Sequence, residues 1–202
     1  LKAGDSVAIV APSGILLNRE TEIKLAKDLL ESWGLKISIG KHIFNQANHF
    51  AGTDYERSED LQNALDNPNI KAIWSARGGY GTVRILDKLD YTKFIEYPKW
   101  LIGYSDITSL HSQIHILGIE SIHGMMCTSL ADKEEDIKAT ISTFKKAIFG
   151  ESLSYTIKGN KYNKIGEAKG QLIGGNLTLL QTMLGSETVS YTHLTLPTIY
   201  SV

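Results

Sequence analysis

A serine that follows a buried strand and precedes a helix is the residue of this chain best suited to chemistry. An apolar run from Trp100 ends at Gly103, the chain turns through Tyr104-Ser105-Asp106, and a helical pattern begins at once. Hydrolases use such a turn to lift a serine hydroxyl out of a sheet, and the first helical turn offers free N–H groups to a developing oxyanion. Because Ile107 stands where an α/β-hydrolase has glycine, the alternative is that Ser105 or Asp106 is only the N-cap.

A glycine-rich loop is the second candidate for chemistry. In Arg77-Gly-Gly-Tyr-Gly81, three glycines allow backbone amides to approach a ligand closely and to adopt positive φ. The glycine patterns of nucleotide-binding loops are absent, so an oxyanion-hole donor facing Ser105 is a better interpretation than a phosphate cradle. A tight strand-to-helix turn is the structural alternative. The Arg77 guanidinium can pair with a substrate carboxylate, and a structural salt bridge is at least as good an explanation.

No histidine or cysteine stands out as a catalytic base or nucleophile. His111 and His115 have the spacing of a metal pair, but no clustered carboxylate or cysteine completes a site. His123 follows a predicted strand and is a candidate base for Ser105, or a residue that shapes the pocket. Cys127 lacks an adjacent base or cation, so we expect a small buried hydrophobic residue there.

The elements that must position these residues alternate between strand and helix. Apolar runs predict five strands, at Ser6–Val10, Leu35–Ile39, Ile70–Trp74, Leu101–Ile102 and Ile119–Ile122. Helical patterns lie between and after them, at Arg19–Trp33, Thr53–Asp66, Thr82–Lys88, Ile107–Leu117 and from Asp132 to Gly150. Thr53 and Glu56 have the spacing of a capping box. We therefore predict an α/β fold, with a doubly wound, mostly parallel sheet covered by helices on both faces.

The parallel sheet brings separate loops to one edge. Ligands bind outside the carboxyl ends of such strands. Four loops follow predicted strands and should gather there, namely Ala11–Gly14, Arg77–Gly81, Gly103–Asp106 and His123–Gly124, with Asn45–Thr53 over them. This edge is the predicted site.

The character of the sequence changes after Gly150. Residues 1–150 form the predicted nucleophile domain, and 151–166 read as a linker or crossover because they are polar and carry turn signals. Residues 167–188 are expected to begin a second domain, with a short strand at Gly170–Ile173 and a helix capped by Asn176 that ends at Gly185. Residues 189–202 have no obvious partner and are expected to be non-native sequence.

Composition describes an ordinary globular protein. The 202 residues are 42% hydrophobic, and 21 basic against 22 acidic residues give a net charge of −1. This balance offers no case for nucleic acid or an anionic membrane as partner. One cysteine excludes an intramolecular disulfide and fits a reducing compartment. We find neither a signal peptide nor an apolar run of membrane-spanning length.

Taken together, these loops resemble the LD-carboxypeptidase family, serine peptidase family S66. The resemblance covers roughly residues 3 to 188, and the Arg-Gly-Gly-Tyr-Gly and Gly-Tyr-Ser-Asp combination is specific. The matching motifs are Ala11–Gly14, Phe50–Asp54 with Arg57 and Asp60-Leu61, Ala76–Gly81 with Arg84, Gly103–Thr108, His123-Gly124 and Gly170–Leu177. One departure is Met125, where the family usually has proline.

The resemblance implies a cytoplasmic serine carboxypeptidase that hydrolyses an L,D amide bond and releases D-alanine from the murein tetrapeptide during cell-wall recycling. Ser105 matches the nucleophile, and the amides of Asp106 and of Gly78 or Gly79 match the oxyanion hole. Further candidates for the substrate pocket are Ser13, Arg77, Tyr80 and His123. No metal or cofactor is implied, the partner is a small peptide, and a homodimer is compatible with the family.

The glutamate and histidine of the family's triad lie beyond the Gly-Gly-Asn-Leu helix, so their roles are not transferred to Glu187 or His193. We therefore expect this chain alone to be nearly inactive. Two alternatives stay open. A microcin-immunity peptidase shares the motifs and cleaves peptidyl-nucleotide antibiotics, and a non-catalytic module would hold a peptide carboxylate or an anion in the glycine-rich loop.

Overall fold

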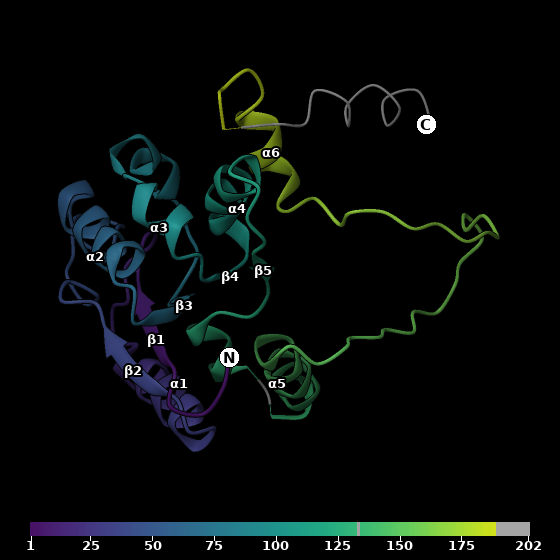
Figure 1. The fold of residues 1–202 in the computed structure, drawn as a ribbon, viewed down its shortest axis with the longest axis horizontal. Helices are drawn as coiled ribbons and strands as arrows, with labels where there is room; N and C mark the ends of the chain where they lie inside the picture. Colours follow the sequence, from purple (N-terminus) through teal and green to yellow (C-terminus); the bar gives the residue numbers. More distant parts are fainter. Residues whose placement is uncertain (133, 189–202) are drawn as a thin grey trace.

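Five parallel strands form the centre of the fold (Figure 1). The structure is a computed structural model and describes residues 1–132 and 134–188. The strands are β1 (Ser6–Val10), β2 (Lys36–Ile39), β3 (Ile70–Ser75), β4 (Trp100–Gly103) and β5 (Ile122–His123). Their order across the sheet is β2-β1-β3-β4-β5, so the direction of winding reverses between β1 and β3. The predicted α/β fold is confirmed, and this reversal marks where ligands of such sheets bind.

Helices cover both faces of the sheet (Figure 1). One core joins β1 residues Val7 and Ile9 to the helices α1 (Glu20–Ser32) and α5 (Glu134–Phe149). The other joins Ala8 and Val10 to α2 (Asp54–Asp66), α3 (Thr92–Glu96) and α4 (Thr108–Ile116). Alternate residues of the same strand thus enter opposite cores. This explains why the central strands read as unbroken apolar runs.

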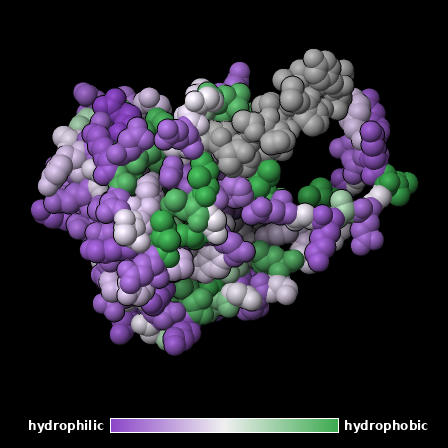
Figure 2. Space-filling model, turned by 45° about the horizontal axis from the view of Figure 1, so that its top comes forward, coloured by the Kyte–Doolittle hydropathy of each residue, from purple (hydrophilic) through white to green (hydrophobic). Residues whose placement is uncertain are grey.

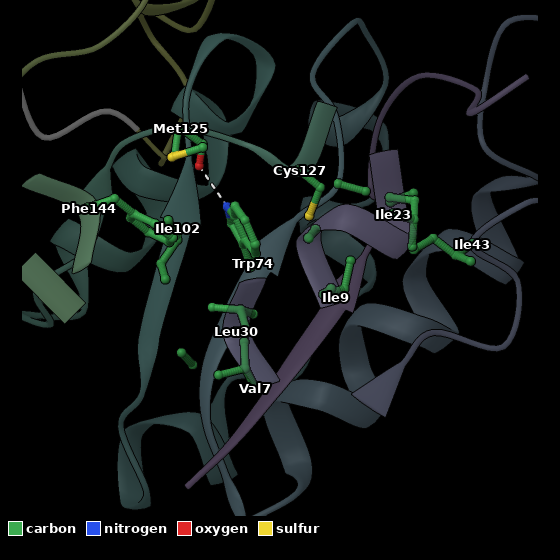
Figure 3. Close-up of a cluster of buried hydrophobic side chains, with 14 of the residues drawn as sticks. Val7, Ile9, Ile23, Leu30, Ile43, Trp74, Ile102, Met125, Cys127 and Phe144 are labelled. Atoms are coloured by element: carbon green, nitrogen blue, oxygen red, sulfur yellow. Dashed lines mark hydrogen bonds between the residues drawn. The ribbon is translucent and has the colours of Figure 1, made fainter. Parts of the chain in front are cut away.

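Trp74 anchors the first core near the site (Figure 3). Its ring is fully buried and lies 5.0 Å, centroid to centroid, from that of Phe144 on α5. The indole N–H donates a 2.7 Å hydrogen bond to the carbonyl of Met125, drawn as the dashed line in Figure 3. The turn after β5 is therefore held by a core side chain through the carbonyl of Met125.

The predicted capping box of α2 is present. Glu56 N–H donates to Thr53 Oγ1 at 3.2 Å, and Thr53 N–H donates to the Glu56 carboxylate at 2.8 Å. These bonds satisfy two N–H groups that a helix start leaves free. They also fix the end of the Asn45–Thr53 loop, which passes beside the carboxyl edge of the sheet.

Several predicted elements were wrong in detail. The Thr82–Lys88 helix is two single 3₁₀ turns, η1 (Thr82–Arg84) and η2 (Leu86–Lys88), and two elements were not predicted, α3 and the 3₁₀ helix η4 (Cys127–Ala131). The fifth strand is shorter than expected. The helix predicted from Asp132 is present as α5, which is assigned from Glu134, and Asp132 has the extended backbone usual just before a helix, with φ −66° and ψ 163°.

Beyond α5 the chain forms a long arm, residues 151–176, which projects from the body (Figures 1 and 2). The arm contains neither helix nor strand, so the strand predicted at Gly170–Ile173 is absent. The arm returns to α6 (Leu177–Thr182), which packs on α4 and ends three residues before the predicted stop. The predicted N-cap is confirmed, since Asn176 Oδ1 accepts from Leu179 N–H at 3.2 Å. The domain boundaries proposed for this region stay predictions.

Residues 189–202, expected to be non-native, lie outside the described residues. None of the helices that the structure describes combines the length and apolar character needed to cross a membrane.

Candidate active site

Ser105 stands at the sharp turn between β4 and α4. Its φ is +61°, a left-handed conformation that is uncommon for residues other than glycine. Such a conformation costs about 1–3 kcal/mol and persists only where the surroundings enforce it. A 3₁₀ turn, η3 (Ser105–Ile107), leads directly into α4. The hydroxyl is thus presented at the carboxyl edge of the sheet, and Ser105 is half-buried.

The N-cap alternative is wrong for both residues of the turn. Neither η3 nor α4 has a side-chain cap hydrogen bond. The absent glycine at position 107 also has an explanation. A Cβ on Gly103 would lie only 2.8 Å from the Ile107 side chain, so Ile107 occupies the space that glycine leaves open two residues before Ser105. The sharp turn therefore has a glycine before Ser105, at position 103 in β4, and does not need a second one after it at position 107.

The glycine-rich loop lies directly against Ser105. A Cβ on Gly78 would come 3.2 Å from Ser105 Cβ and 3.4 Å from its Oγ, so any side chain there would crowd the hydroxyl. Gly79 has φ +124°, and its Cα faces Gly14 in the loop after β1. The Gly14 N–H donates to the Gly78 carbonyl at 3.1 Å, which fixes the orientation of the loop. The absence of a side chain on Gly78 thus lets the backbone of the glycine-rich loop approach the hydroxyl of Ser105 closely.

Ser13 lies below the surface, unlike the pocket candidates Arg77, Tyr80 and His123. Its side chain is fully buried, and its hydroxyl bonds to Asp106 and Thr82. The structure therefore gives Ser13 a role in holding loops together, on the inner side of the site.

Arg77 and Tyr80 lie on the outer part of the glycine-rich loop. Arg77 donates to the Ile15 carbonyl at 2.5 Å and forms no ion pair with any residue in the described ranges. The structural salt bridge considered for Arg77 is therefore absent from the described part of the chain, and its guanidinium instead links the glycine-rich loop to the loop after β1 through a hydrogen bond. Tyr80 is 50% exposed, and its ring lies 6.1 Å from Phe50 and 6.4 Å from His49. The Asn45–Thr53 loop therefore does lie over the glycine-rich loop.

His123 lies on the far side of Tyr104 from the glycine-rich loop. Its exposed ring is 6.3 Å from that of Tyr104, and both residues line an open pocket of about 390 Å³. The remaining lining residues are Gly124, Met125, Ser129, Asp132, Ile137 and Thr140. No hydrogen bond joins Ser105 to His123 or to another histidine of residues 1–132 and 134–188. His123 therefore has the surroundings of a pocket residue.

His111 supports the turn from behind. Its Nε2–H donates to the carbonyl of Gly103 at 2.9 Å, and its Nδ1 accepts from the Ser121 hydroxyl at 2.8 Å. The carbonyl can only accept, which assigns the tautomer. Burial lowers the pKa of His111 to about 4, against the opposing effect of the hydrogen bond to Gly103. His111 is therefore neutral in the folded protein near pH 7, which fits a core residue.

We expect His111 to make the fold acid-sensitive. In the unfolded chain a histidine titrates near 6.5, so its contribution is complete above that pH and is lost as the pH falls towards about 4. The loss should approach about 3 kcal/mol, measured as the free energy of unfolding in urea at pH 7 and pH 4.5. His111→Gln should flatten this dependence, whereas the control His115→Gln, one turn along α4, should keep it. Equal slopes in both variants would contradict the assignment.

Cys127 and His42 are both in surroundings typical of residues that support the fold. Cys127 is fully buried, and burial raises the pKa of its thiol, so it has the surroundings of an inert core residue. His42 bonds to the Asp60 carboxylate at 3.1 Å. No group of three or more metal-ligating side chains occurs within the part of the chain that the structure describes.

Three residues near Ser105 were not singled out as functional from the sequence. Thr82 binds Asp106, Arg57 is buried between the loops, and the Met126 side chain lies beside Gly78 and Ser105. Thr82 follows the glycine-rich loop directly, which was a usable signal. Arg57 stood among the motifs of the resemblance without a role, and Met126 follows the His123–Gly124 loop, but their contacts with the site depend on the fold.

Comparison with known proteins assigns a family to this arrangement. Residues 7–124 match the model of the LD-carboxypeptidase N-terminal domain. The chain is 36% identical over 191 residues to the murein tetrapeptide carboxypeptidase of Pseudomonas aeruginosa, covering 89% of this chain and 60% of that protein. It is 34% identical over 189 residues to a probable murein peptide carboxypeptidase of Bacillus subtilis, covering 92% of this chain and 59% of that one.

Solved structures agree. The wild-type microcin C7 self-immunity protein MccF superposes with a TM-score of 0.79 at 26% identity, covering 94% of this chain and 65% of that one. The muramoyltetrapeptide carboxypeptidase of Oxalobacter formigenes superposes with a TM-score of 0.77 at 29% identity, covering 91% of this chain and 61% of that one. The chain thus spans about three fifths of the length of these relatives.

Proposed function

The chain belongs to the LD-carboxypeptidase family, and on that premise we propose that it carries the nucleophile of a serine peptidase that cleaves a terminal L,D amide bond. The observation that carries the proposal is Ser105 itself. It is held at φ +61° at the end of β4, with Gly78 packed against its hydroxyl. A strained serine at a strand–helix turn beside a glycine-rich loop is the arrangement of a nucleophile with its oxyanion hole.

In the proposed reaction, Ser105 Oγ attacks the scissile carbonyl, and its proton passes to a general base. The amide of Asp106 and that of Gly78 or Gly79 stabilise the oxyanion. Collapse of this intermediate releases the terminal D-amino acid, which takes up the proton, and leaves an acyl group on Ser105. Water then hydrolyses the ester and frees the enzyme. No step needs a metal or a redox cofactor.

The proposed substrate is the murein tetrapeptide, which loses its terminal D-alanine in the cytoplasm during cell-wall recycling. Support comes from the names of the relatives from Pseudomonas and Bacillus. Cleavage of peptidyl nucleotides is the second candidate, because MccF superposes over most of this chain. A direct comparison of the two substrates, in a protein that also carries a C-terminal segment like that of its relatives, discriminates between them.

The test of the nucleophile is covalent labelling. The C-terminal segment of a full-length relative is joined behind residue 188, and the protein is treated with a serine-directed phosphonate. We expect mass spectrometry to find the label on Ser105. The label should disappear in Ser105→Ala and remain in the control Ser58→Ala, which removes an exposed hydroxyl on α2. Failure to label Ser105 would favour a non-catalytic module that binds a peptide carboxylate.

A further inference from the structure

The carboxylate of Asp106 joins three loops at the edge of the sheet. Asp106 is 1% exposed, and its Oδ2 accepts hydrogen bonds from Ser13 Oγ at 2.7 Å, Thr82 Oγ1 at 2.7 Å and Thr82 N–H at 2.9 Å. The hydroxyl oxygens of Ser13 and Thr82 are themselves 2.5 Å apart. Ser13 follows β1, Thr82 follows the loop after β3, and Asp106 follows β4. One oxygen atom therefore connects the ends of three neighbouring strands.

This connection determines where the glycine-rich loop lies. At its start, Ala76 N–H donates to the Val10 carbonyl at 2.8 Å, so the loop leaves the sheet from a fixed point. At its end, Thr82 is bound to Asp106 through both its backbone and its hydroxyl. Asp106 is the residue next to Ser105. The loop that carries Gly78 is therefore hydrogen-bonded to neighbouring segments at both of its ends.

Arg57 supplies the counter-charge and a second restraint. Its side chain is fully buried, and Nη1 donates to the Pro12 carbonyl at 2.5 Å and to the Gly81 carbonyl at 2.8 Å. These carbonyls belong to the residues that precede Ser13 and Thr82. Burial lowers the pKa of Arg57, and the carboxylates of Asp54 and Asp106 oppose that shift. The guanidinium is ion-paired with Asp54, and its charge also partly offsets that of the nearby Asp106 carboxylate, which would disfavour an oxyanion on Ser105.

We infer that Asp106 is a positioning residue, whose carboxylate sets the distance between the glycine-rich loop and Ser105 through the hydroxyls of Ser13 and Thr82. The inference rests on the proposed function of Ser105. Preorganised donors stabilise an oxyanion only when their positions are fixed beforehand, and a displacement of about 1 Å can cost about 10²-fold in rate. The side chain of Asp106 fixes the loop that carries one proposed donor, while its own backbone amide is the other.

The experiment compares two substitutions at position 82 in the 202-residue chain. Thr82→Val keeps the shape and the N–H group but removes the hydroxyl, whereas Thr82→Ser keeps the hydroxyl and removes a methyl group. The probe is a peptidyl boronic acid, which forms a tetrahedral adduct with a serine hydroxyl and releases a proton to solvent. We expect its affinity, followed by ¹¹B NMR, to fall about tenfold or more in Thr82→Val and to recover in Thr82→Ser.

A second measurement reports on the loop without relying on chemistry at Ser105. In ¹⁵N relaxation, the order parameters of Gly78 and Gly79 should fall in Thr82→Val from about 0.85 towards about 0.6, and should recover in Thr82→Ser. If Thr82→Val does not fold, Ser13→Ala carries the same test. Its matched control is Ser75→Ala, because Ser75 Oγ is buried at the end of β3 and has no partner among the residues described.

The outcomes separate the inference from the function on which it rests. Unchanged boronate affinity and order parameters in Thr82→Val would overturn the positioning role alone. Equal losses in Thr82→Val and Thr82→Ser would also overturn it, because they would indicate packing and not hydrogen bonding. Failure of the phosphonate to label Ser105 in the protein with the joined C-terminal segment would overturn Ser105 as the nucleophile, and the inference with it. Where the unaltered 202-residue chain gives no tetrahedral boron signal, the order parameters of Gly78 and Gly79 decide the positioning role.

Discussion

Hydrolysis of an L,D-tetrapeptide by the 202-residue chain alone is expected to be about 10⁴- to 10⁶-fold slower than by a full-length relative such as the Pseudomonas enzyme. The reason is that Ser105 has no hydrogen bond to a histidine in the described residues. A serine without a base keeps only the rate enhancement from binding and the oxyanion hole. The measurement is release of D-alanine under single-turnover conditions, with both proteins at equal concentration.

Two variants make this expectation sharper. Ser105→Ala should change the residual rate of the chain little, because catalytic residues act as a unit and a serine without a hydrogen-bonded base adds little to the rate. His123→Ala should also have little effect, since that ring lies in the pocket beyond Tyr104. Turnover at the relative's rate would contradict the proposal. A loss of that rate in His123→Ala would then identify the base within this chain.

Replacing Arg57 by alanine is expected to destabilise the fold by about 3–5 kcal/mol. The substitution removes a fully buried guanidinium that bonds to the carbonyls of Pro12 and Gly81 and to the Asp54 carboxylate. Two buried acceptors would lose their donor, and a cavity would open under the glycine-rich loop. The free energy of unfolding in urea measures the loss.

Arg84→Ala is the matched control for this prediction. Arg84 binds the same Asp54 carboxylate through two bonds, of 3.0 and 2.9 Å, but its side chain is 47% exposed. An exposed ion pair contributes little because solvent screens it, so this variant should remain close to the unaltered protein. Arg57→Lys should fall between the two, because one ammonium cannot reach all three acceptors. If Arg57→Ala and Arg84→Ala lost the same free energy of unfolding, the buried hydrogen bonds of Arg57 would not be the source of its stabilising effect.

The central strands, α2 and the Ser105 turn were predictable because their signals are local. A run such as Val7–Val10 is apolar throughout because both faces of β1 are buried, and the Thr53 capping box needs only residues three apart. The position of the site followed from the parallel sheet, whose strand ends all lie at one edge. These features need no knowledge of contacts distant in sequence.

The failures have a common physical cause in contacts between distant segments. Residues 82–88 have a helical pattern, but Thr82 is bound to Asp106 and Arg84 to Asp54, and the segment bends between them as two 3₁₀ turns. A strand at Gly170–Ile173 would need an edge to pair with, and the arm passes through solvent. The role of Arg57 was not predicted, because its partners Pro12 and Gly81 are 45 and 24 residues away in the sequence.

The arm at residues 151–176 has a consequence for whatever follows α6. The backbone returns to the body at Gly175 and Asn176, where the Asn176 N–H donates to Thr108 Oγ1 at 2.9 Å, in the first turn of the helix that follows Ser105. A segment joined behind residue 188 is connected to this point through α6, so any encounter with Ser105 would be intramolecular, at an effective concentration in about the millimolar range. The same segment supplied as a separate molecule would have to reach such concentrations in solution. The arm can therefore be called a tether, because it connects such a segment covalently to the body and makes a separate binding affinity unnecessary.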